Sequence, residues 1–195
     1  MSKDQCLISI NGSNSTIENL SSFISITKAE DFISNKVLDI EIAKSENAQR
    51  INLTLNSSST DPIDFEINLT VNEGAILEFV DESNYSNNSN IRLVTQLNKN
   101  SCFELYKLNS YNNENTNKFY HNCSLLENST FKDYSFSNGS KENSSKTIIN
   151  LDDVNSRYLG SGVSINNSTN SDTEIEIRHN TCLLYTSPSP RDNGR

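Results

Sequence analysis

The sequence predicts an all-β fold, a single-stranded β-solenoid of about five coils, each of about 27 residues. Three observations predict it: a short motif that recurs at a nearly fixed interval, apolar positions spaced two apart before that motif, and polar stretches of the same period. A repeat of roughly 20 to 50 residues is typical of stacked units that bury their apolar faces only against one another. We therefore expect strand, corner and loop to follow in the same order in every coil.

The recurring motif is a Gly or Asn followed by a small residue, and it predicts a tight corner. Gly and Asn are the residues that most readily take a left-handed backbone conformation. Three residues later, a large apolar or aromatic side chain follows in four copies, whereas the first copy has Arg50. The spacing between successive copies is nearly constant, which is typical of repeats stacked in register. The predicted corner residues are Asn47, Gly74, Asn100, Asn128 and Asn155.

Most corners are preceded by apolar positions spaced two apart, which predicts a strand. The first coil has Ile40 and Ile42 there, and the last coil, shifted by one residue, has Ile149 and Leu151. Side chains two apart lie on one face of a strand, so these positions are expected to face inward. The predicted strands of the solenoid are 64–71, 75–81, 90–97, 102–108, 118–126, 130–137, 146–151, 157–165 and 173–179.

Between these strands lie stretches built almost entirely of Asn, Ser, Asp, Glu, Lys and Gly, which predict the outer loops of the coils. Side chains of these types hydrogen-bond the backbone in turns. The chain has 31 Asn and 31 Ser, a composition that suggests disorder, but its apolar residues are placed too regularly for a disordered chain. The predicted loops are 82–89, 109–117, 138–145 and 166–173.

The chain is predicted to form one domain, because 195 residues with 33% hydrophobic residues can bury one modest core. Residues 1–36 are expected to hold short strands and a cap that lead into the solenoid, with strands at 7–10 and 23–26. A helical turn is possible at 28–33. Residues 37–181 are expected to form the solenoid itself.

The C-terminal segment 182–195 is interpreted as foreign to the protein. It looks like the translated end of a sequencing-library adapter, and it holds two of the three Pro residues of the chain. We exclude it from the fold, as a fusion scar would be excluded. The solenoid is then expected to be truncated near Thr181, and its last strand, 173–179, to have an unpaired edge.

Charge and hydropathy argue against several kinds of partner. The formal net charge is −9, and the sequence has no basic stripe or basic helix, which argues against binding to nucleic acid or to an anionic membrane. No apolar run approaches the length of a membrane span, and residues 1–10 hold too few apolar residues for the core of a signal peptide. We expect a cytoplasmic protein with neither a nucleic-acid nor a membrane partner.

One group of residues resembles a metal-ligand set. Without 182–195, the cysteines are Cys6, Cys102 and Cys123, too far apart in sequence for a disulfide framework or a zinc ribbon. His121 and Cys123, together with Cys102, could in principle bind zinc or iron. However, His121 and Cys123 occupy the inward register of their strand, where a buried thiol is common. We expect no metal site and keep the three residues as weak candidates.

Several short segments, taken in order, resemble one known family. The segments are 8–12 (Ile-Ser-Ile-Asn-Gly) with 20–21, 61–63 (Asp-Pro-Ile), 71–78 (Val-Asn-Glu-Gly-Ala-Ile-Leu-Glu), 151–156, and 171–173 leading to His179. Their order and spacing over roughly residues 7–180 resemble the SufB/SufD family of the SufBCD iron–sulfur cluster assembly complex. The Asn-Gly step at 11–12 favours SufD over SufB.

The resemblance implies a right-handed parallel β-helix that serves as a scaffold and is not a catalyst by itself. It implies pairing with SufB, both subunits being held by the ATPase SufC, and an iron–sulfur cluster that belongs to the complex rather than to this chain. The family's interface segment and the helices that dock SufC would lie beyond residue 181, so no interface residue is assigned. His179 matches a family histidine, but its place after Ile175 and Ile177 favours an ordinary inward side chain.

Enzymes of other families share the β-helix, so a polysaccharide lyase or hydrolase is the alternative, followed by another solenoid binding protein. The adjacent pairs Asp81-Glu82 and Asp152-Asp153 could supply acid and base. They fall at the start of a loop and at a corner, where acidic residues are usually solvated turn formers. The strand positions vary too much for the flat Thr or Asn ladders of an ice-binding or adhesive surface. We therefore expect a protein that is not an enzyme.

Overall fold

The computed structural model describes residues 5–11, 14–28, 37–56, 63–85, 88–111, 114–138, 141–165 and 170–180. Its secondary structure is entirely β over these residues, as predicted. None of the described segments contains a helix of the length and hydropathy that a membrane span requires. The strands are β1 (Gln5–Asn11), β2 (Asn14–Glu18), β3 (Ile24–Lys28), β4 (Val37–Ile42), β5 (Gln49–Asn56), β6 (Ile63–Val71), β7 (Ile76–Asp81), β8 (Asn84–Tyr85), β9 (Ser89–Leu97), β10 (Cys102–Tyr111), β11 (Thr116–Leu125), β12 (Thr130–Asn138), β13 (Glu142–Leu151), β14 (Arg157–Ile165) and β15 (Asn170–His179).

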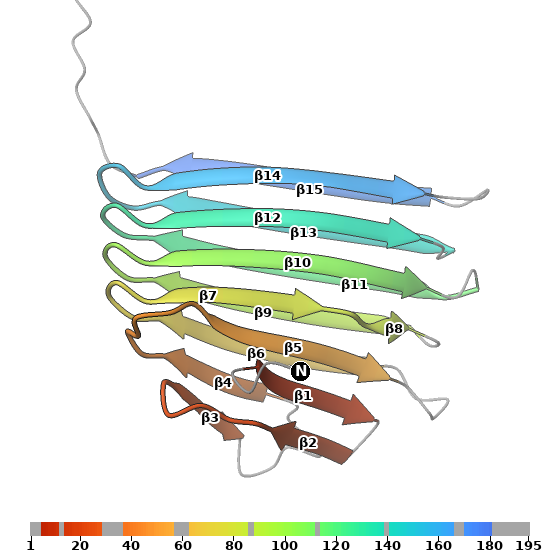
Figure 1. Ribbon diagram of the computed structural model, residues 1–195. Coiled ribbons are helices and arrows are strands. Elements are labelled where there is room, and N and C mark those ends of the chain that lie inside the picture. The colour runs from red at the N-terminus through yellow and green to blue at the C-terminus, as the bar shows by residue number, and fades with distance from the viewer. Residues whose placement is uncertain are drawn as a thin grey trace, which may run out of the picture.

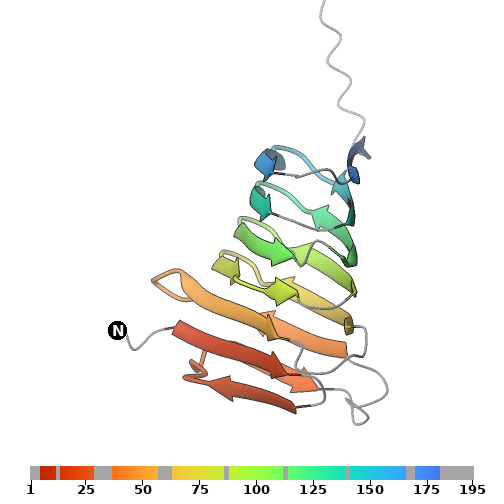
Figure 2. The same ribbon diagram turned by 90° about the vertical axis from the view of Figure 1, so that its right-hand side faces the viewer.

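The strands form two sheets that face each other (Figures 1 and 2). Sheet A has the order β14-β12-β10-β7-β5-β1-β2, with β8 beside β5 and β10, and sheet B has the order β15-β13-β11-β9-β6-β4-β3. Each regular coil gives one strand to each sheet, except that one coil gives both β7 and the short β8 to sheet A. Neighbouring strands pair in parallel, except for the antiparallel pairs β1–β2 and β3–β4. The predicted parallel β-helix is confirmed.

The coil is right-handed and the stack is slightly shorter than predicted. In Figure 1 the parallel strands of sheet A lie in front and run to the right, those of sheet B run back behind them, and the chain climbs with each coil. The regular part has about four turns instead of five. The repeat is visible in the register, because Cys102 lies beside Ile76 of the preceding coil and beside Thr130 of the following coil.

Aromatic and aliphatic side chains of sheet A fill the half of the interior next to the corners, the corner side. One column of side chains runs through Leu77, Phe103, Phe131 and Tyr158, and the first three are fully buried. The rings of Phe103 and Phe131 stack with their centroids 5.1 Å apart. This spacing is close to the distance between paired strands, about 4.8 Å. In-register pairing therefore places equivalent side chains directly on top of one another.

Each corner is a turn that is closed within its coil and bonded to the next coil. Asn100 has φ 58°, and the backbone N–H and the hydroxyl of Ser101 both donate to the carbonyl of Asn98, at 3.1 and 2.6 Å. A positive φ at the third residue of a turn favours Gly or Asn there. The N–H of Asn100 donates to the carbonyl of Glu127 in the following coil at 2.9 Å. Gly74, Asn128 and Asn155 have φ of 68°, 57° and 58° at the equivalent places.

Asn47 does not adopt a positive φ, so the predicted left-handed corner is wrong at this residue. Ile42 and Gln49 lie beside Val71 and Leu77, which leaves six residues in this corner and five in the next. The extra residue removes the need for a tight turn. Instead, the buried amide of Gln49 donates to the hydroxyl of Ser45 at 2.9 Å and organises the corner from inside.

All the predicted solenoid strands are present, with bounds that differ by a few residues. β2, β5 and β8 have no counterpart in the prediction. β13 begins at Glu142, inside the predicted loop 138–145, and β15 begins at Asn170, inside the predicted loop 166–173. The polar residues Asn143 and Ser145 face inward in β13, so the loop that their polarity predicted is wrong at these positions. Most of the possible helical turn at 28–33, and the segment 182–195, lie outside the described residues.

Candidate functional site

The last coil, formed by β14 and β15, has an uncovered interior face (Figure 2). Ile175 and Ile177 of β15 are 50% and 46% exposed. They lie directly beside Thr147 and Ile149 of β13, which are buried. The difference arises because no further strand of the described chain lies over the last coil. Exposed apolar surface of this kind is typical of an interaction site.

Both strands of the last coil also have an unpaired backbone edge. In the part of the chain that the structure describes, β14 pairs only with β12, and β15 only with β13. The N–H and C=O groups along the opposite edges are therefore available to another strand. The unpaired edge predicted for the strand at 173–179 is thus present in β15.

A cavity of about 380 Å³ opens at this end of the solenoid, in the half of the interior next to the outer loops, the loop side. Gly160 and Gly162 of β14 lie directly beside Asp133 and Ser135 of β12. Because glycine has no side chain, these two positions leave the inward face of the last coil open. Both sheets supply polar walls: Lys107, Asn109, Asp133, Ser135, Ser137, Tyr158 and Ser164 from sheet A, and Asn143, Ser145, Thr147 and Thr173 from sheet B.

Three ionisable side chains lie in the interior near this cavity: Asp81, Lys107 and Asp133, each no more than 8% exposed. The Nζ atom of Lys107 is 3.2 Å from both carboxylate oxygens of Asp133 and 4.6 Å from the ring centroid of Phe119. Burial raises the pKa of the Asp81 carboxyl. Hydrogen bonds and the positive charge of Lys107 partly oppose this rise. A buried charge needs such a partner to be tolerated.

Within the segments that the structure describes, two buried polar atoms near the ion pair have no hydrogen-bond partner: Oδ1 of Asp133 and the hydroxyl oxygen of Tyr158. Oδ1 of Asp133 is close to Lys107 but accepts no hydrogen bond from it. Burial, with a smaller contribution from the negative charge of Asp133, raises the pKa of Tyr158 to about 12. The tyrosine therefore keeps its proton and can donate it. Buried polar groups are normally paired, so the Tyr158 hydroxyl indicates a place for a further group, to which the ion-paired Asp133 carboxylate can still offer Oδ1 as an acceptor.

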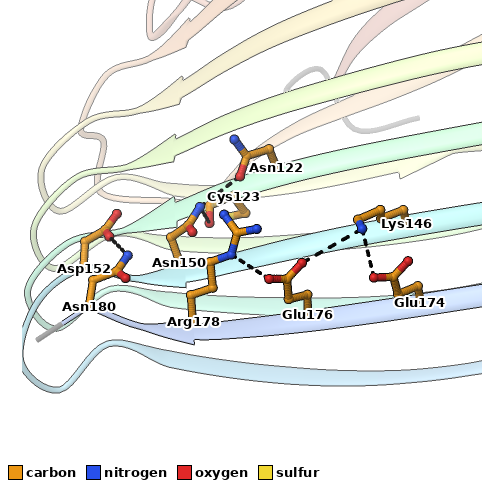
Figure 3. A network of polar contacts seen from close by, with 9 residues as sticks. All are labelled: Asn122, Cys123, Lys146, Asn150, Asp152, Glu174, Glu176, Arg178 and Asn180. Carbon is orange, nitrogen blue, oxygen red and sulfur yellow. Dashed lines mark hydrogen bonds and ion pairs between the residues drawn. The ribbon is translucent and has the colours of Figure 1, made fainter.

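The outer face of sheet B is polar and has several ion pairs (Figure 3). Nζ of Lys146 lies 2.9 Å from a carboxylate oxygen of Glu174 and 4.0 Å from one of Glu176, which also accepts a hydrogen bond from Arg178 at 2.8 Å. Exposed pairs of this type contribute about 0 to 1 kcal/mol each. This face is suited to contact with water.

The outer face of sheet A has an apolar strip in the same coils, beside the ion pair of Glu104 and Lys132. Leu108, Phe136 and Val163 lie side by side on β10, β12 and β14 and are 49%, 42% and 60% exposed. Next to them, the rings of Tyr106 and Tyr134 stack with centroids 5.1 Å apart. A second apolar surface therefore reaches the edge strand β14.

The structure does not bring the three weak metal-ligand candidates together. His121 and Cys123 are buried in β11, whereas Cys102 precedes the inward Phe103 and therefore lies on the outer side of sheet A. Burial raises the pKa of the Cys123 and Cys102 thiols, which disfavours the thiolate that a metal needs. No group of three His, Cys, Asp or Glu suited to a metal ion occurs within the described ranges.

His121 instead belongs to the core. Its Nε2 lies 3.0 Å from the hydroxyl of Thr95, and its ring makes an edge contact with the ring of Phe131 at 5.1 Å between centroids. Burial, reinforced by the charge of Lys107, holds the pKa of His121 well below its ordinary value of 6.5. The histidine is therefore neutral at pH 7. His179 lies beside Leu151 in the inward register of the uncovered coil.

The members of the two acidic pairs lie in different surroundings. Asp81 is buried in the interior, so its expected role as a solvated turn former is wrong, and the next residue, Glu82, is exposed. Asp152 accepts a hydrogen bond from the amide of Asn180 at 2.6 Å. Asp153 accepts one from the next backbone N–H at 2.7 Å, as turn residues do.

Comparisons with known protein families, curated proteins and solved structures find no match to this chain. The pattern of the sequence did not identify the residues that distinguish the uncovered end. Gly160 and Gly162, spaced two apart inside a strand, were the available signal, because glycine in a strand often marks close approach of another group.

Proposed function

We propose that this chain is a SufD-like scaffold subunit of a cytoplasmic SufBCD-type complex for iron–sulfur cluster assembly. The observation that carries the proposal is the uncovered last coil, where two strand edges and two exposed isoleucines, Ile175 and Ile177, end the described stack. A partner with the same fold, as SufB would have, could add one strand to each sheet and cover both side chains. Strand addition of this kind combines backbone hydrogen bonds with apolar burial.

Two further features support the proposal. The segments that resemble the SufB/SufD family occur in the expected order, and the parallel β-helix is the fold that the resemblance implies. In this proposal the chain positions its partners and does not itself perform the chemistry. The iron–sulfur cluster and the ATPase, SufC, belong to the assembled complex.

The test is co-expression of the tagged chain with the SufB and SufC proteins of the same genome, followed by affinity purification and size-exclusion chromatography. We expect the three proteins to elute together. The double substitution Ile175→Asp and Ile177→Asp should abolish co-purification, because it places two charges on the apolar surface that the partner would cover. Glu174→Gln, on the outer side of the same strand, is the matched control and should leave the complex intact. A wild-type chain that elutes alone would contradict the proposal.

A further inference from the structure

The cavity at the uncovered end is made by two glycines that lie under hydroxyl groups. A Cβ atom at Gly160 would lie 2.2 Å from the hydroxyl oxygen of Tyr158, and a Cβ at Gly162 would lie 2.2 Å from Oγ of Ser135. Such distances are much shorter than van der Waals contact. Any larger residue at these positions would displace a hydroxyl from the wall. The glycines therefore keep both the space and its polar lining.

Two buried polar atoms near this space can each take a further hydrogen bond, and they define what a bound group must do. Oδ1 of Asp133 can only accept a hydrogen bond, whereas the hydroxyl of Tyr158 can donate as well as accept. Asp133 is 5% exposed and lines the cavity. A group that pairs with both atoms must donate to Asp133 and can accept from Tyr158. A hydroxyl group does both, whereas an ammonium group can only donate.

The charges around the cavity argue against an ionic ligand. A cation at Asp133 would meet the ammonium of Lys107, which is 3.2 Å from the same carboxylate. An anion at Lys107 would meet that carboxylate and the buried Asp81. The ion pair of Lys107 and Asp133 already has a net charge close to zero. A neutral ligand can use its hydrogen-bonding groups without the cost of adding a charge.

The size and walls of the cavity fit a small molecule with several hydroxyl groups. Its volume of about 380 Å³ is much larger than one water molecule, whose share of liquid volume is about 30 Å³. Serine, threonine and asparagine side chains line it from both sheets. Phe119 and Ile175 add apolar surface for the carbon side of a ring or chain. We propose that this cavity binds a neutral polyhydroxylated compound, either a polyol or a monosaccharide.

The proposal is tested with glycerol and glucose as probes on the full chain, by isothermal calorimetry and by NMR chemical-shift changes at residues 133, 160 and 162. We expect saturable binding of at least one probe. Tyr158→Phe should weaken it by about tenfold, because it deletes a hydroxyl that has no hydrogen-bond partner among the described residues and should therefore leave the fold unchanged. Tyr134→Phe, on the outer face of sheet A, is the matched control and should bind like the wild type.

Three results would overturn the proposal. One is the absence of saturable binding of both probes, which would mean that the cavity holds only water. Another is equal binding by wild type and Tyr158→Phe. The third is saturable binding of methylammonium or acetate in place of both probes. The inference does not depend on a SufB partner, because the free chain contains all the residues named.

Discussion

The two ends of the solenoid differ in how they are closed. At the N-terminal end, β2 and β3 run antiparallel to β1 and β4, and the inward side chains of Ile8 and Ile24 are 2% and 4% exposed. At the C-terminal end, the last described strands are parallel to their neighbours, and Ile175 and Ile177 are about half exposed. A parallel coil therefore buries its apolar face only when another element lies over it. Reversal of the chain direction provides that cover at the N-terminal end.

The interior changes along the same direction. One column of inward positions in sheet A begins with Ile8 and Leu53 and continues with Asp81, Lys107 and Ser135. The first two residues form a dry core, whereas the later ones create a polar region that leads to the cavity. The comparison shows that a solenoid column keeps its geometry when its chemistry changes. The predictions below test whether the C-terminal half depends on its buried polar groups and on what covers its end.

The largest effect is expected at the buried ion pair. Asp133→Ala leaves the ammonium of Lys107 buried without its main partner, so it should lower the free energy of unfolding by about 3 to 5 kcal/mol in a urea titration. The double substitution Lys107→Met with Asp133→Leu removes both charges and should recover most of this loss. Lys132→Met, which breaks the more exposed pair with Glu104, should cost about 1 kcal/mol or less. Equal losses for Asp133→Ala and Lys132→Met would show that the interior of this half is hydrated.

The next largest effect is expected from comparing one inward residue of a covered coil with the equivalent residue of the uncovered last coil. Ile149 and Ile177 occupy the same inward column one coil apart, with exposed fractions of 0% and 46%. Ile149→Ala should lower the free energy of unfolding by about 2 to 5 kcal/mol, because it leaves a buried cavity. Ile177→Ala should cost about 1 kcal/mol, since half of the side chain already contacts water. Equal costs that depend on protein concentration would indicate that another copy covers the end in solution.

The period of the sequence was sufficient to predict the fold because parallel in-register stacking repeats one local environment in every coil. Gly74, Asn100 and Asn128 are spaced as the corners require, and each has the expected left-handed conformation. The prediction of a left-handed conformation failed at Asn47 because its corner has one residue more than the next corner and does not need a tight turn. The strand β5 was not predicted although its Ile51, Leu53 and Leu55 alternate, because Arg50 occupies the position where the other coils have a large apolar or aromatic side chain. The spacing of the motif therefore indicates the corners, and the alternation of apolar residues independently indicates the strands.

The candidate site could not be predicted in the same way. Alternation shows which side chains face inward, but a charged residue is normally expected to face water. Lys107 and Asp133 are stable in the interior because they lie on adjacent coils, where the register brings them together although they are far apart in sequence. This pairing depends on the three-dimensional register, which the sequence pattern determines only to within one or two residues.

A smaller effect is expected at the corners, where the two halves differ again. Asn128→Ala should lower the free energy of unfolding by about 1 kcal/mol, because alanine tolerates a positive φ poorly. Asn128→Gly should cost less, because glycine keeps the backbone conformation and loses only what alanine also loses, the side-chain hydrogen bonds to Asn100, Glu127 and Asn155. Asn47→Ala should change stability by about 0.5 kcal/mol or less, because Asn47 has no positive φ. Thermal and urea unfolding of the three variants measure these differences. A cost at Asn47 equal to that at Asn128 would mean that the corners are equivalent in solution.

The smallest effect at neutral pH is expected from His121, whose buried ring belongs to the C-terminal half. Above its ordinary pKa of 6.5 the histidine is neutral in the folded and the unfolded chain, so its protonation does not affect stability. As the pH falls below 6.5, the unfolded chain binds a proton that the folded chain excludes, because burial lowers the folded-state pKa. The free energy of unfolding should then fall by about 1 kcal/mol per pH unit until the folded-state pKa is reached.

The comparison of wild type with His121→Gln isolates this contribution, because glutamine cannot take up a proton and its amide can still pair with the hydroxyl of Thr95. The difference in free energy of unfolding between the two proteins, measured with urea from pH 7.5 to 5, should shrink as the pH falls. His179→Gln, at the exposed second histidine of the chain, is the matched control for the substitution. A constant difference between wild type and His121→Gln would show that the histidine is hydrated in solution. The polar interior would then extend from the loop side of the C-terminal half into its aromatic core.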